Sequence, residues 1–312
     1  MNTHVEIQGR LGDEQVADVL ALVEAAAEAD GVRPLNEHVM LHLRYGGDPG
    51  ARAVLIRMDG ENGELAGFAH LDPADPVEGP SGELVVHPAF RGRGVGRRLL
   101  EAVLTESGGR LRLWAHGDHP AASRLAASLG LTRARSLWKM RRSLSDPLPA
   151  VRLPEGVRLR TFEPERDEEA WLALNAQAFA THPEQGAWTF DDLKRREQEP
   201  WFDPAGFFLA VRPGPADGHD RLVGFHWTKV DRGGTGDGDG HEPIGEVYVV
   251  GVSPDERGTG LGRALTLAGL AHLRSLGLAQ VMLYVDEENV PAIRLYESIG
   301  FTRWDTDVMY RR

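Results

Sequence analysis

Two short stretches of the chain place an arginine ahead of closely spaced glycines. They are Arg91-Gly-Arg-Gly-Val-Gly96 and Arg257-Gly-Thr-Gly-Leu-Gly262, and each lies between an apolar run and a run with helical periodicity. Glycines let a backbone approach a diphosphate closely, while the free N–H groups and the dipole of a helix start favour its negative charge. A dinucleotide fingerprint needs another glycine spacing, and the phosphate loop of nucleotide hydrolases needs Gly-Lys-Ser/Thr. The sequence therefore predicts two diphosphate-binding helix starts.

The run before the second glycine loop carries a side chain that suits acyl transfer to an amine. Such a transfer needs a base for the amine, a polarised carbonyl and a proton for the leaving group. Glu246 and Tyr248 are two residues apart on a strand-like run, so their side chains share one face, and we expect Glu246 to be the base. Backbone N–H groups near Val250 can polarise the carbonyl without any side chain.

The two glycine loops belong to a longer internal repeat. Residues 83–100 resemble residues 249–266, with Arg91 and Arg257 166 residues apart. Residues 111–131 resemble residues 281–301, with Gly130 and Gly300 170 residues apart. A polar and proline-containing stretch at 143–156 has the composition of a linker. We expect an N-terminal domain at 1–147 and a catalytic C-terminal domain at 148–312.

Both copies share one order of helices and strands. In the first copy we expect helices at 13–29 and 120–129, a helix after the glycine loop, and strands at 53–58, 65–71, 84–87 and 111–115. In the second copy we expect helices at 167–180 and 189–198 and strands at 207–212, 221–230, 244–252 and 280–285. This order predicts an α+β fold in which each copy is a twisted mixed β-sheet flanked by helices.

Composition narrows the classes of partner. The 312 residues are 41% apolar and contain no cysteine, which excludes disulfides, thiolate metal ligands and a cysteine nucleophile. A net charge of −12 disfavours nucleic acid and anionic membrane as partners. The chain has neither a signal pattern nor an apolar stretch of ~20 residues, and we expect a cytoplasmic protein. The Asp- and Gly-rich run at 231–240 joins two expected strands, whereas a calcium loop needs flanking helices, so we expect no metal.

The repeated loop resembles the signature of the GNAT superfamily of N-acetyltransferases. The resemblance implies that the loops bind the pyrophosphate of acetyl-CoA, and that a bulge separates the preceding strand from the next one. The pantetheine arm then pairs with the backbone in that gap. The superfamily's proton donor is commonly a Tyr four residues before Gly-Phe, which matches Tyr296 ahead of Gly300-Phe301. The cofactor contacts implied in this sequence are Leu84, Val85, Val86, Arg91, Gly92, Arg93, Gly94, Val95, Gly96, Val250, Gly251, Val252, Arg257, Gly258, Thr259, Gly260, Leu261, Gly262, Arg263, Asn289 and Arg294.

The first copy lacks the groups that handle protons. At the two offsets, Glu246 corresponds to Pro80, Tyr296 to Ala126 and Asn289 to His119. We therefore expect catalysis by Glu246 and Tyr296 in the second copy alone, with the first copy a scaffold or a non-catalytic binder of acetyl-CoA.

Further segments resemble a narrower family, the mycothiol synthases of actinobacteria. They are Leu113-Trp-Ala-His-Gly117, His182-Pro-Glu-Gln-Gly-Ala-Trp188, and 283–292 ahead of 295–301. The resemblance implies acetylation of the cysteinyl amine of a cysteine–glucosamine–inositol conjugate, and it places around that substrate Glu37, Glu184, Lys229, Glu246 and Tyr284. Carboxylates suit an ammonium group and sugar hydroxyls, while Lys229 and Tyr284 can hydrogen-bond a polyol.

Two other functions remain open at this point. One is acetylation of another small amine or a peptide N-terminus by the same superfamily, and the other is a non-catalytic acyl-CoA sensor. In the favoured case the partner is a small thiol-sugar, with no nucleic acid or membrane partner, and the protein is a monomer.

Overall fold

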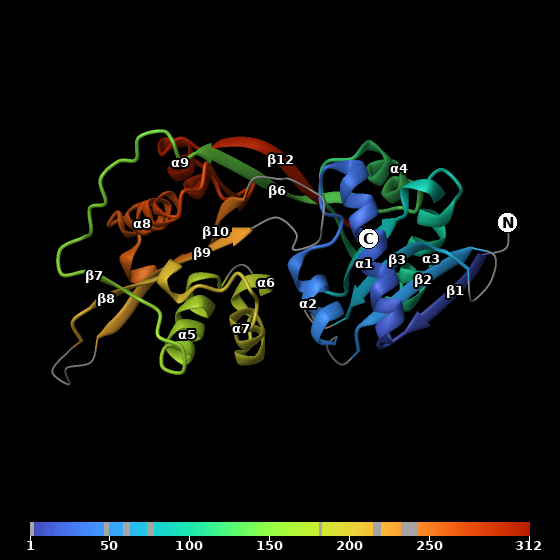
Figure 1. Ribbon diagram of the computed structural model, residues 1–312, viewed down its shortest axis with the longest axis horizontal. Coiled ribbons are helices and arrows are strands. Elements are labelled where there is room, and N and C mark those ends of the chain that lie inside the picture. The colour runs from blue at the N-terminus through green and yellow to red at the C-terminus, as the bar shows by residue number, and fades with distance from the viewer. Residues whose placement is uncertain are drawn as a thin grey trace. The chain divides into compact units, whose positions relative to one another are not determined.

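The computed structural model describes residues 3–46, 50–58, 63–73, 78–180, 183–214, 220–231 and 243–312. The side chains of residues 183, 184 and 231 lie outside this description, as does the Asp- and Gly-rich run after Asp231. The chain divides into two compact units. Unit 1 comprises Met1–Trp138 and Asp305–Arg312, and unit 2 comprises Lys139–Trp304. Figure 1 shows the elements of both units coloured along the chain.

Unit 1 is built on a mixed sheet in the order β1-β2-β3-β4-β5-β12. Strands β1 to β4 pair antiparallel, β4 and β5 are parallel, and β12 runs antiparallel to β5. The bounds are β1 Thr3–Gln8, β2 Arg52–Met58, β3 Leu65–Asp72, β4 Ser81–Val86, β5 Arg112–Ala115 and β12 Thr302–Arg311.

Helices cover both faces of this sheet because its strands are apolar on both sides. One face packs against α1 (Asp13–Asp30) and α2 (Glu37–Tyr45), with Leu22 and Val39 against Leu55 and Phe68. The other face packs against α3 (Val95–Glu106) and α4 (Pro120–Ser128), and β12 contributes Val308 and Tyr310 to this core. A short 3-10 turn, η1 (Pro88–Phe90), leads from β4 into the glycine loop.

Unit 2 repeats this arrangement with the order β6-β11-β10-β9-β8-β7. Strands β7 to β10 pair antiparallel, and β10 and β11 are parallel. The bounds are β6 Thr132–Ser143, β7 Arg158–Thr161, β8 Phe207–Arg212, β9 Arg221–Asp231, β10 Ile244–Val252 and β11 Gln280–Asp286.

The two faces of the unit 2 sheet differ in the side chains that cover them. α5 (Glu168–Ala178) and α7 (Phe190–Glu197) lie over an aromatic core that includes Phe207 and Trp227. α8 (Leu261–Ser275) lies over an aliphatic core, with Leu261 and Leu265 against Ala210 and Val223. The remaining elements are α6 Pro183–Gly186, η2 Pro204–Gly206, η3 Pro254–Glu256 and α9 Val290–Ser298.

The structure confirms the expected fold class and adds elements that the pattern did not indicate. Strands β8 and β10 have the expected bounds, and α1 and α5 lie within two residues of theirs. The additions are β1, α2 and the short β7, whose runs are too short for a clear period. The division into units falls after Trp138 within β6 and after Trp304 within β12. The domain ranges 1–147 and 148–312 stay a prediction about which fragments fold alone.

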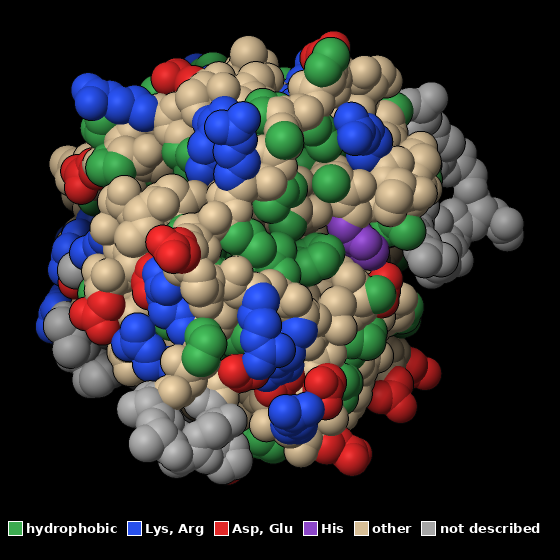
Figure 2. Space-filling model, turned by 90° about the vertical axis from the view of Figure 1, so that its left-hand side faces the viewer, with side chains coloured by type: hydrophobic (Ala, Val, Ile, Leu, Met, Phe, Trp, Pro, Cys, Tyr) green, Lys and Arg blue, Asp and Glu red, His purple; other side chains and the backbone are tan. Residues whose placement is uncertain are grey.

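The described surface gives three further observations. The face in Figure 2 carries basic side chains interspersed with acidic ones around a hydrophobic strip, so the residues drawn there form no continuous basic patch. None of the helices within the described ranges is long and apolar enough to span a membrane. Among the same residues, no group of three or more His, Asp or Glu is arranged to hold a metal ion.

Candidate active site

The strand that carries Glu246 loses one of its two neighbours part-way along. β10 pairs with β9 through Val252, but its parallel pairing with β11 ends at Val247, opposite Leu283. Beyond that point the backbone of Val250, Gly251 and Val252 has no β11 partner within these two strands. An extended, amide-bearing chain can pair with such an edge. The separation expected before the glycine loop is therefore present.

Unit 1 has the same separation. The pairing of β4 with β5 ends at Glu83, opposite Trp114, while β3 pairs with β4 as far as Val86. The expected cofactor contacts Leu84, Val85 and Val86 thus lie beyond the last β5 partner.

A bulge in β10 sets the direction of its side chains. The register with β9 shifts between Val247 and Val249, so Tyr248 is the extra residue. We expected this bulge near Val250, which was wrong, because pairing from Val249 to Val252 is regular. Val249 lies opposite Trp227, and Glu246 lies opposite Lys229. Because Trp227 and Lys229 share a face of β9, Glu246 and Val249 both face the side of α5 and α7.

The bulge residue Tyr248 joins the aromatic side chains around Lys229. The Lys229 Nζ lies 4.6 Å from the ring centroid of Trp201 and 5.2 Å from that of Tyr248. The Tyr248 hydroxyl accepts a hydrogen bond from Arg196 Nε at 2.8 Å. Cation–π contacts of this kind hold a lysine in one place at the cost of its conformational freedom. The site therefore places a fixed cation directly across the strand pair from Glu246.

The second glycine loop has a conformation that requires glycine. Gly258 and Gly260 have φ of +79° and +87°, and Gly92 and Gly94 in unit 1 have φ of +73° and +84°. A Cβ on any of the four would meet no protein atom within 4 Å, so backbone conformation and close ligand approach are the constraints, rather than packing. The first backbone hydrogen bond of α8 runs from Ala264 N–H to Gly260, so the preceding N–H groups are free for an anion. This cradle fits a diphosphate.

Arginines near the two loops have different partners. In unit 1, Arg91 donates to both carboxylate oxygens of Asp30, at 2.6 and 2.8 Å. In unit 2, Arg257 is exposed and makes no hydrogen bond or ion pair with the residues that the structure describes. Arg263, expected to contact the cofactor, donates to Ser298 Oγ at 2.6 Å and so joins α8 to α9. Arg257 is therefore the guanidinium of this group that remains open to an anion.

Helix α9 carries the expected proton donor. Tyr296 is half-buried, and its ring packs edge-on against Phe301 at a centroid distance of 5.8 Å. Burial raises the pKa of Tyr296 to about 12, so its phenol is neutral and able to donate at physiological pH. Asn289 caps the helix, with its Oδ1 accepting from Ala292 N–H at 3.3 Å, and Arg294 is exposed.

Known proteins match both the fold and the motifs. The model of the acetyltransferase (GNAT) family matches residues 21–131 and 163–301. The chain belongs to the GNAT acetyltransferase family. A protein named mycothiol acetyltransferase from Thermobispora bispora is 71% identical over 312 residues, with both chains covered completely. One of the same name from Streptosporangium roseum is 65% identical, again with both chains covered completely.

Solved GNAT structures agree with the tandem architecture. A related N-acetyltransferase from Sphaerobacter thermophilus is 26% identical, with a TM-score of 0.68 over 99% of this chain and 95% of that one. A tandem GNAT protein from the clavulanic acid biosynthesis pathway is 21% identical, with a TM-score of 0.69 over 99% and 98%. The chain is thus an N-acetyltransferase that uses an acyl-CoA, as the glycine loops predicted.

The sheet register refines the comparison of the two GNAT repeats. Glu246 lies opposite Met282, and the equivalent of Met282, 170 residues earlier, is Arg112, which lies opposite Ser81. Ser81 therefore takes the place of Glu246 in unit 1, whereas the sequence offset pointed to Pro80. The bulge at Tyr248 adds one residue to β10 and accounts for the difference. Unit 1 still has no carboxylate at this place, and the equivalent of Tyr296 is the buried Ala126.

The remaining residues expected around the GNAT acceptor lie on several elements. Glu37 is the first residue of α2 in unit 1. Tyr284 in β11 is 42% exposed, and Lys139 Nζ lies 5.7 Å from its ring centroid. Glu184 falls in α6, and its side chain lies outside the described part of the chain. Their contacts with an acceptor stay predictions.

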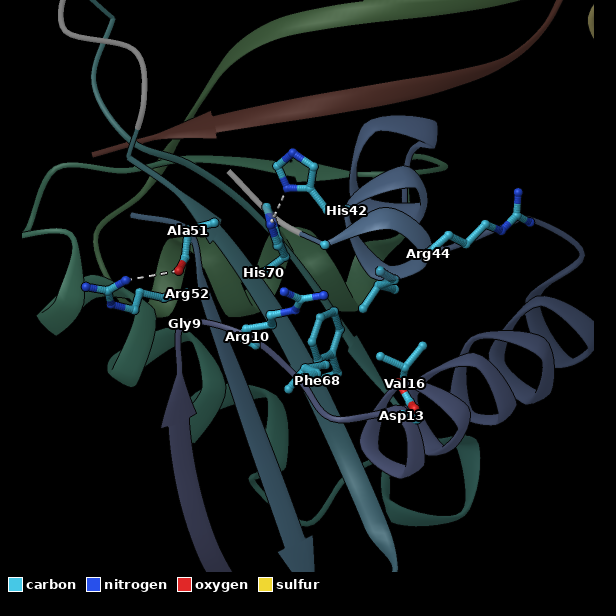
Figure 3. Close-up of a pocket in the computed structure, with 14 residues that line it drawn as sticks. Gly9, Arg10, Asp13, Val16, His42, Arg44, Ala51, Arg52, Phe68 and His70 are labelled. Carbon is cyan, nitrogen blue, oxygen red and sulfur yellow. Dashed lines mark hydrogen bonds between the residues drawn. The ribbon is translucent and has the colours of Figure 1, made fainter. Parts of the chain in front are cut away.

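Several polar residues of this acetyltransferase were missed by the sequence analysis. Arg196 is one, because its contact with Tyr248 joins residues 52 positions apart. A buried set in unit 1, Glu83, His116 and Asp307, is another. Unit 1 also has a pocket beside His42 and His70, lined by the ends of β1 and α2, the start of α1, and β2 and β3 (Figure 3). None of the expected site residues lines that pocket.

Proposed function

We propose that this acetyltransferase transfers the acetyl group of acetyl-CoA to the cysteinyl amine of a cysteine–glucosamine–inositol conjugate, giving mycothiol and CoA. The observation that carries the proposal is the match, over the whole length of both chains, with proteins named mycothiol acetyltransferase at 71% and 65% identity. The position of Glu246 beside the end of the β10–β11 pairing supports it.

Glu246 acts as the base in this proposal. A cysteinyl α-amine has a reference pKa of about 7.7–8.0, so a carboxylate that removes its proton, directly or through water, needs little driving force. Lys229, held over Trp201 and Tyr248, lies across the strand pair, where it can donate to substrate hydroxyls. Tyr284, Glu37 and Glu184 complete the acceptor side as proposed contacts.

The acyl-CoA side uses backbone groups. The N–H groups at the start of α8 hold the pyrophosphate, and the open edge of Val250–Val252 pairs with the pantetheine arm. A backbone N–H in this edge polarises the thioester carbonyl. Tyr296, neutral because of its raised pKa, donates a proton to the departing thiolate. Unit 1 keeps the glycine loop, and we propose that it binds acetyl-CoA without turnover, which a mass spectrum of the purified protein would reveal.

Two substitutions test the catalytic assignment. Glu246→Gln and Tyr296→Phe should each lower kcat by about 10²-fold, the usual size of a general acid or base contribution, with the KM for acetyl-CoA little changed. Ser81→Ala changes the equivalent place in unit 1 and serves as the matched control, with full activity expected. Steady-state rates of CoA release measure all three. Full activity in the Glu246→Gln, Tyr296→Phe double variant would refute the assignment.

The choice of acceptor distinguishes the alternatives. CoA release is measured with the cysteinyl conjugate, with the same conjugate lacking cysteine, and with polyamines and short peptides. Turnover of the first alone supports the proposal, whereas turnover of polyamines or peptides supports a different amine substrate. Binding of acetyl-CoA without turnover of any amine supports an acyl-CoA sensor. We also propose that the protein acts as a cytoplasmic monomer, and light scattering of the purified protein tests its oligomeric state.

A further inference from the structure

Unit 1 contains a buried ion network that has no part in the acetyl-transfer scheme. His116, directly after β5, has its Nδ1 2.9 Å from Asp307 Oδ2 and its Nε2 3.2 Å from Glu83 Oε1. The side chains of Glu83, His116 and Asp307 are only 3%, 12% and 2% exposed. We name these three residues the His116 network. Burying three ionisable groups is costly unless each is paired, so a positional role is a reason to keep them.

The outer oxygens of the His116 network bind the main chain. Glu83 Oε2 accepts the N–H of Asn36 at 2.7 Å, and Asp307 Oδ1 accepts the N–H of Gly117 at 2.8 Å. A charged imidazolium donates from both nitrogens, which leaves both carboxylates free to accept these backbone bonds. The network therefore links the turn after β5 to the residue that precedes α2.

Helix α2 depends on this link for its position. It has nine residues, too few to be stable alone, and Asn36 caps it by accepting Val39 N–H at 2.9 Å. A second polar contact, His42 Nδ1 to His70 Nε2 at 3.1 Å, joins the middle of α2 to β3 (Figure 3). His70 lies opposite Glu83 in the sheet. Both contacts thus attach α2 to one pair of neighbouring sheet positions.

We propose that the His116 network is a positioning device for Glu37, the acceptor-binding carboxylate in unit 1. Glu37 follows Asn36 directly and is the first residue of α2, so any shift of the Asn36 backbone moves Glu37 with it. The inference rests on the proposed function, in which Glu37 contacts the acceptor. Asp307 comes from the last strand of the chain, so the end of the sequence fixes a residue near its beginning.

Kinetics of network variants test this role. With saturating acetyl-CoA, Asp307→Asn should raise the KM for the cysteinyl conjugate about tenfold, the effect of one lost charge-assisted hydrogen bond, with kcat and the acetyl-CoA KM unchanged. Glu37→Gln should raise the same KM. In the Glu37→Gln background Asp307→Asn should add little, because both changes act through one carboxylate. Glu83→Gln keeps an oxygen for Asn36 and should raise this KM less than Glu83→Leu.

A matched control separates positioning from stability. Asp18→Asn breaks the 2.7 Å bond to Arg57 between α1 and β2 in the same unit, and it should leave the acceptor KM unchanged. A lower Tm with an unchanged acceptor KM in Asp307→Asn would overturn the proposal, as would additive effects of Asp307→Asn and Glu37→Gln. Should Asp307→Asn fail to fold, the comparison of Glu83→Gln with Glu83→Leu decides in its place.

Failure of this inference is distinguishable from failure of the proposed function. If Glu37→Gln leaves the acceptor KM unchanged while the wild-type protein turns over the conjugate, only the role of Glu37 and its network is lost. If the wild-type protein does not acetylate the conjugate at all, the proposed function itself fails.

Discussion

His116 and His226 show how surroundings set the charge of one side-chain type. Burial lowers the pKa of both, but the charge of Glu83 and the hydrogen bonds with Asp307 and Glu83 raise that of His116 to about 10. The Nδ1–H of His226 donates to the Leu265 carbonyl at 2.7 Å, which offsets little of the burial effect, and its pKa falls to about 4. At neutral pH the first ring is charged and the second is neutral.

The charge of His116 predicts a loss of stability in alkali. A raised folded pKa stabilises fully below the unfolded value of 6.5, and this contribution disappears as the pH rises through about 10. The free energy of unfolding should therefore fall by about 1.4 kcal/mol per pH unit across that window, one proton's worth. Urea unfolding of wild-type protein and of His116→Gln measures the slope. A slope that persists in the variant would contradict the prediction.

The groups that face His116 all favour its charged form. Glu83 of β4 and Asp307 of β12 contact the ring, and the Asp305 carboxylate lies 4.0 Å from the place of a Cβ on the neighbouring Gly117. These three carboxylates carry the charge opposite to that of the imidazolium. Neutralising one of them alone, as in Asp307→Asn, should reduce the alkaline slope without abolishing it.

At the scale of elements, the glycine loops and the bulge divide the work of binding. Each loop starts a helix with a glycine of positive φ, and each preceding strand leaves its parallel neighbour before the loop begins. The bulge at Tyr248 occurs in the second copy, where Glu246 stands. No shift is recorded in the β3–β4 pairing over residues 67–72 and 81–86, all of which the structure describes. One fold therefore gives two anion cradles but one catalytic strand.

Substitution of a loop glycine should affect cofactor affinity beyond its effect on stability. Gly260→Ala at φ +87° and Gly277→Ala at φ +80° should each cost about 1–2 kcal/mol of unfolding free energy, the penalty for a Cβ in the left-handed region. Only Gly260→Ala should also raise the acetyl-CoA KM, by about tenfold, because its methyl group keeps the diphosphate from the helix start. Urea unfolding and steady-state kinetics measure the two effects. Equal KM values for both variants would argue against a diphosphate at this loop.

At the scale of the whole molecule, each compact unit draws on distant parts of the chain. Val308 to Arg311 of β12 pair with β5, and Val308 and Tyr310 are buried in the unit 1 core. Unit 1 therefore includes the last eight residues of the chain, Asp305–Arg312, together with its first 138. A fragment that stops at the linker lacks a core strand.

We expect the fragment 1–147 to be unable to fold by itself. Without Val308 and Tyr310 the core of unit 1 has a cavity and β5 has an unpaired edge, which costs several kcal/mol of a small domain's stability. Circular dichroism and urea unfolding of the fragment should show no cooperative transition, and addition of a peptide of residues 302–312 should restore one. Cooperative unfolding of the fragment alone would instead support the domain range 1–147.

The sequence by itself determined the repeat, the mixed α+β architecture, the two glycine loops and the pair Glu246 and Tyr296. These features are local: glycine spacing, apolar periodicity and a constant offset between copies record them within short windows. Only the tertiary structure decided the position of the bulge, the replacement of Pro80 by Ser81 as the counterpart of Glu246, and the contacts of Arg196 and Trp201 around Tyr248 and Lys229.

The His116 network belongs to the second group for the same reason. His116 and Asp307 are 191 residues apart, and each alone is an ordinary polar residue at the end of a strand-like run. Strand pairing brings them together, and pairing between distant segments leaves no periodicity or spacing in either one. Chemistry built on a single loop or strand is therefore readable in this sequence, whereas chemistry built across the sheet had to await the fold.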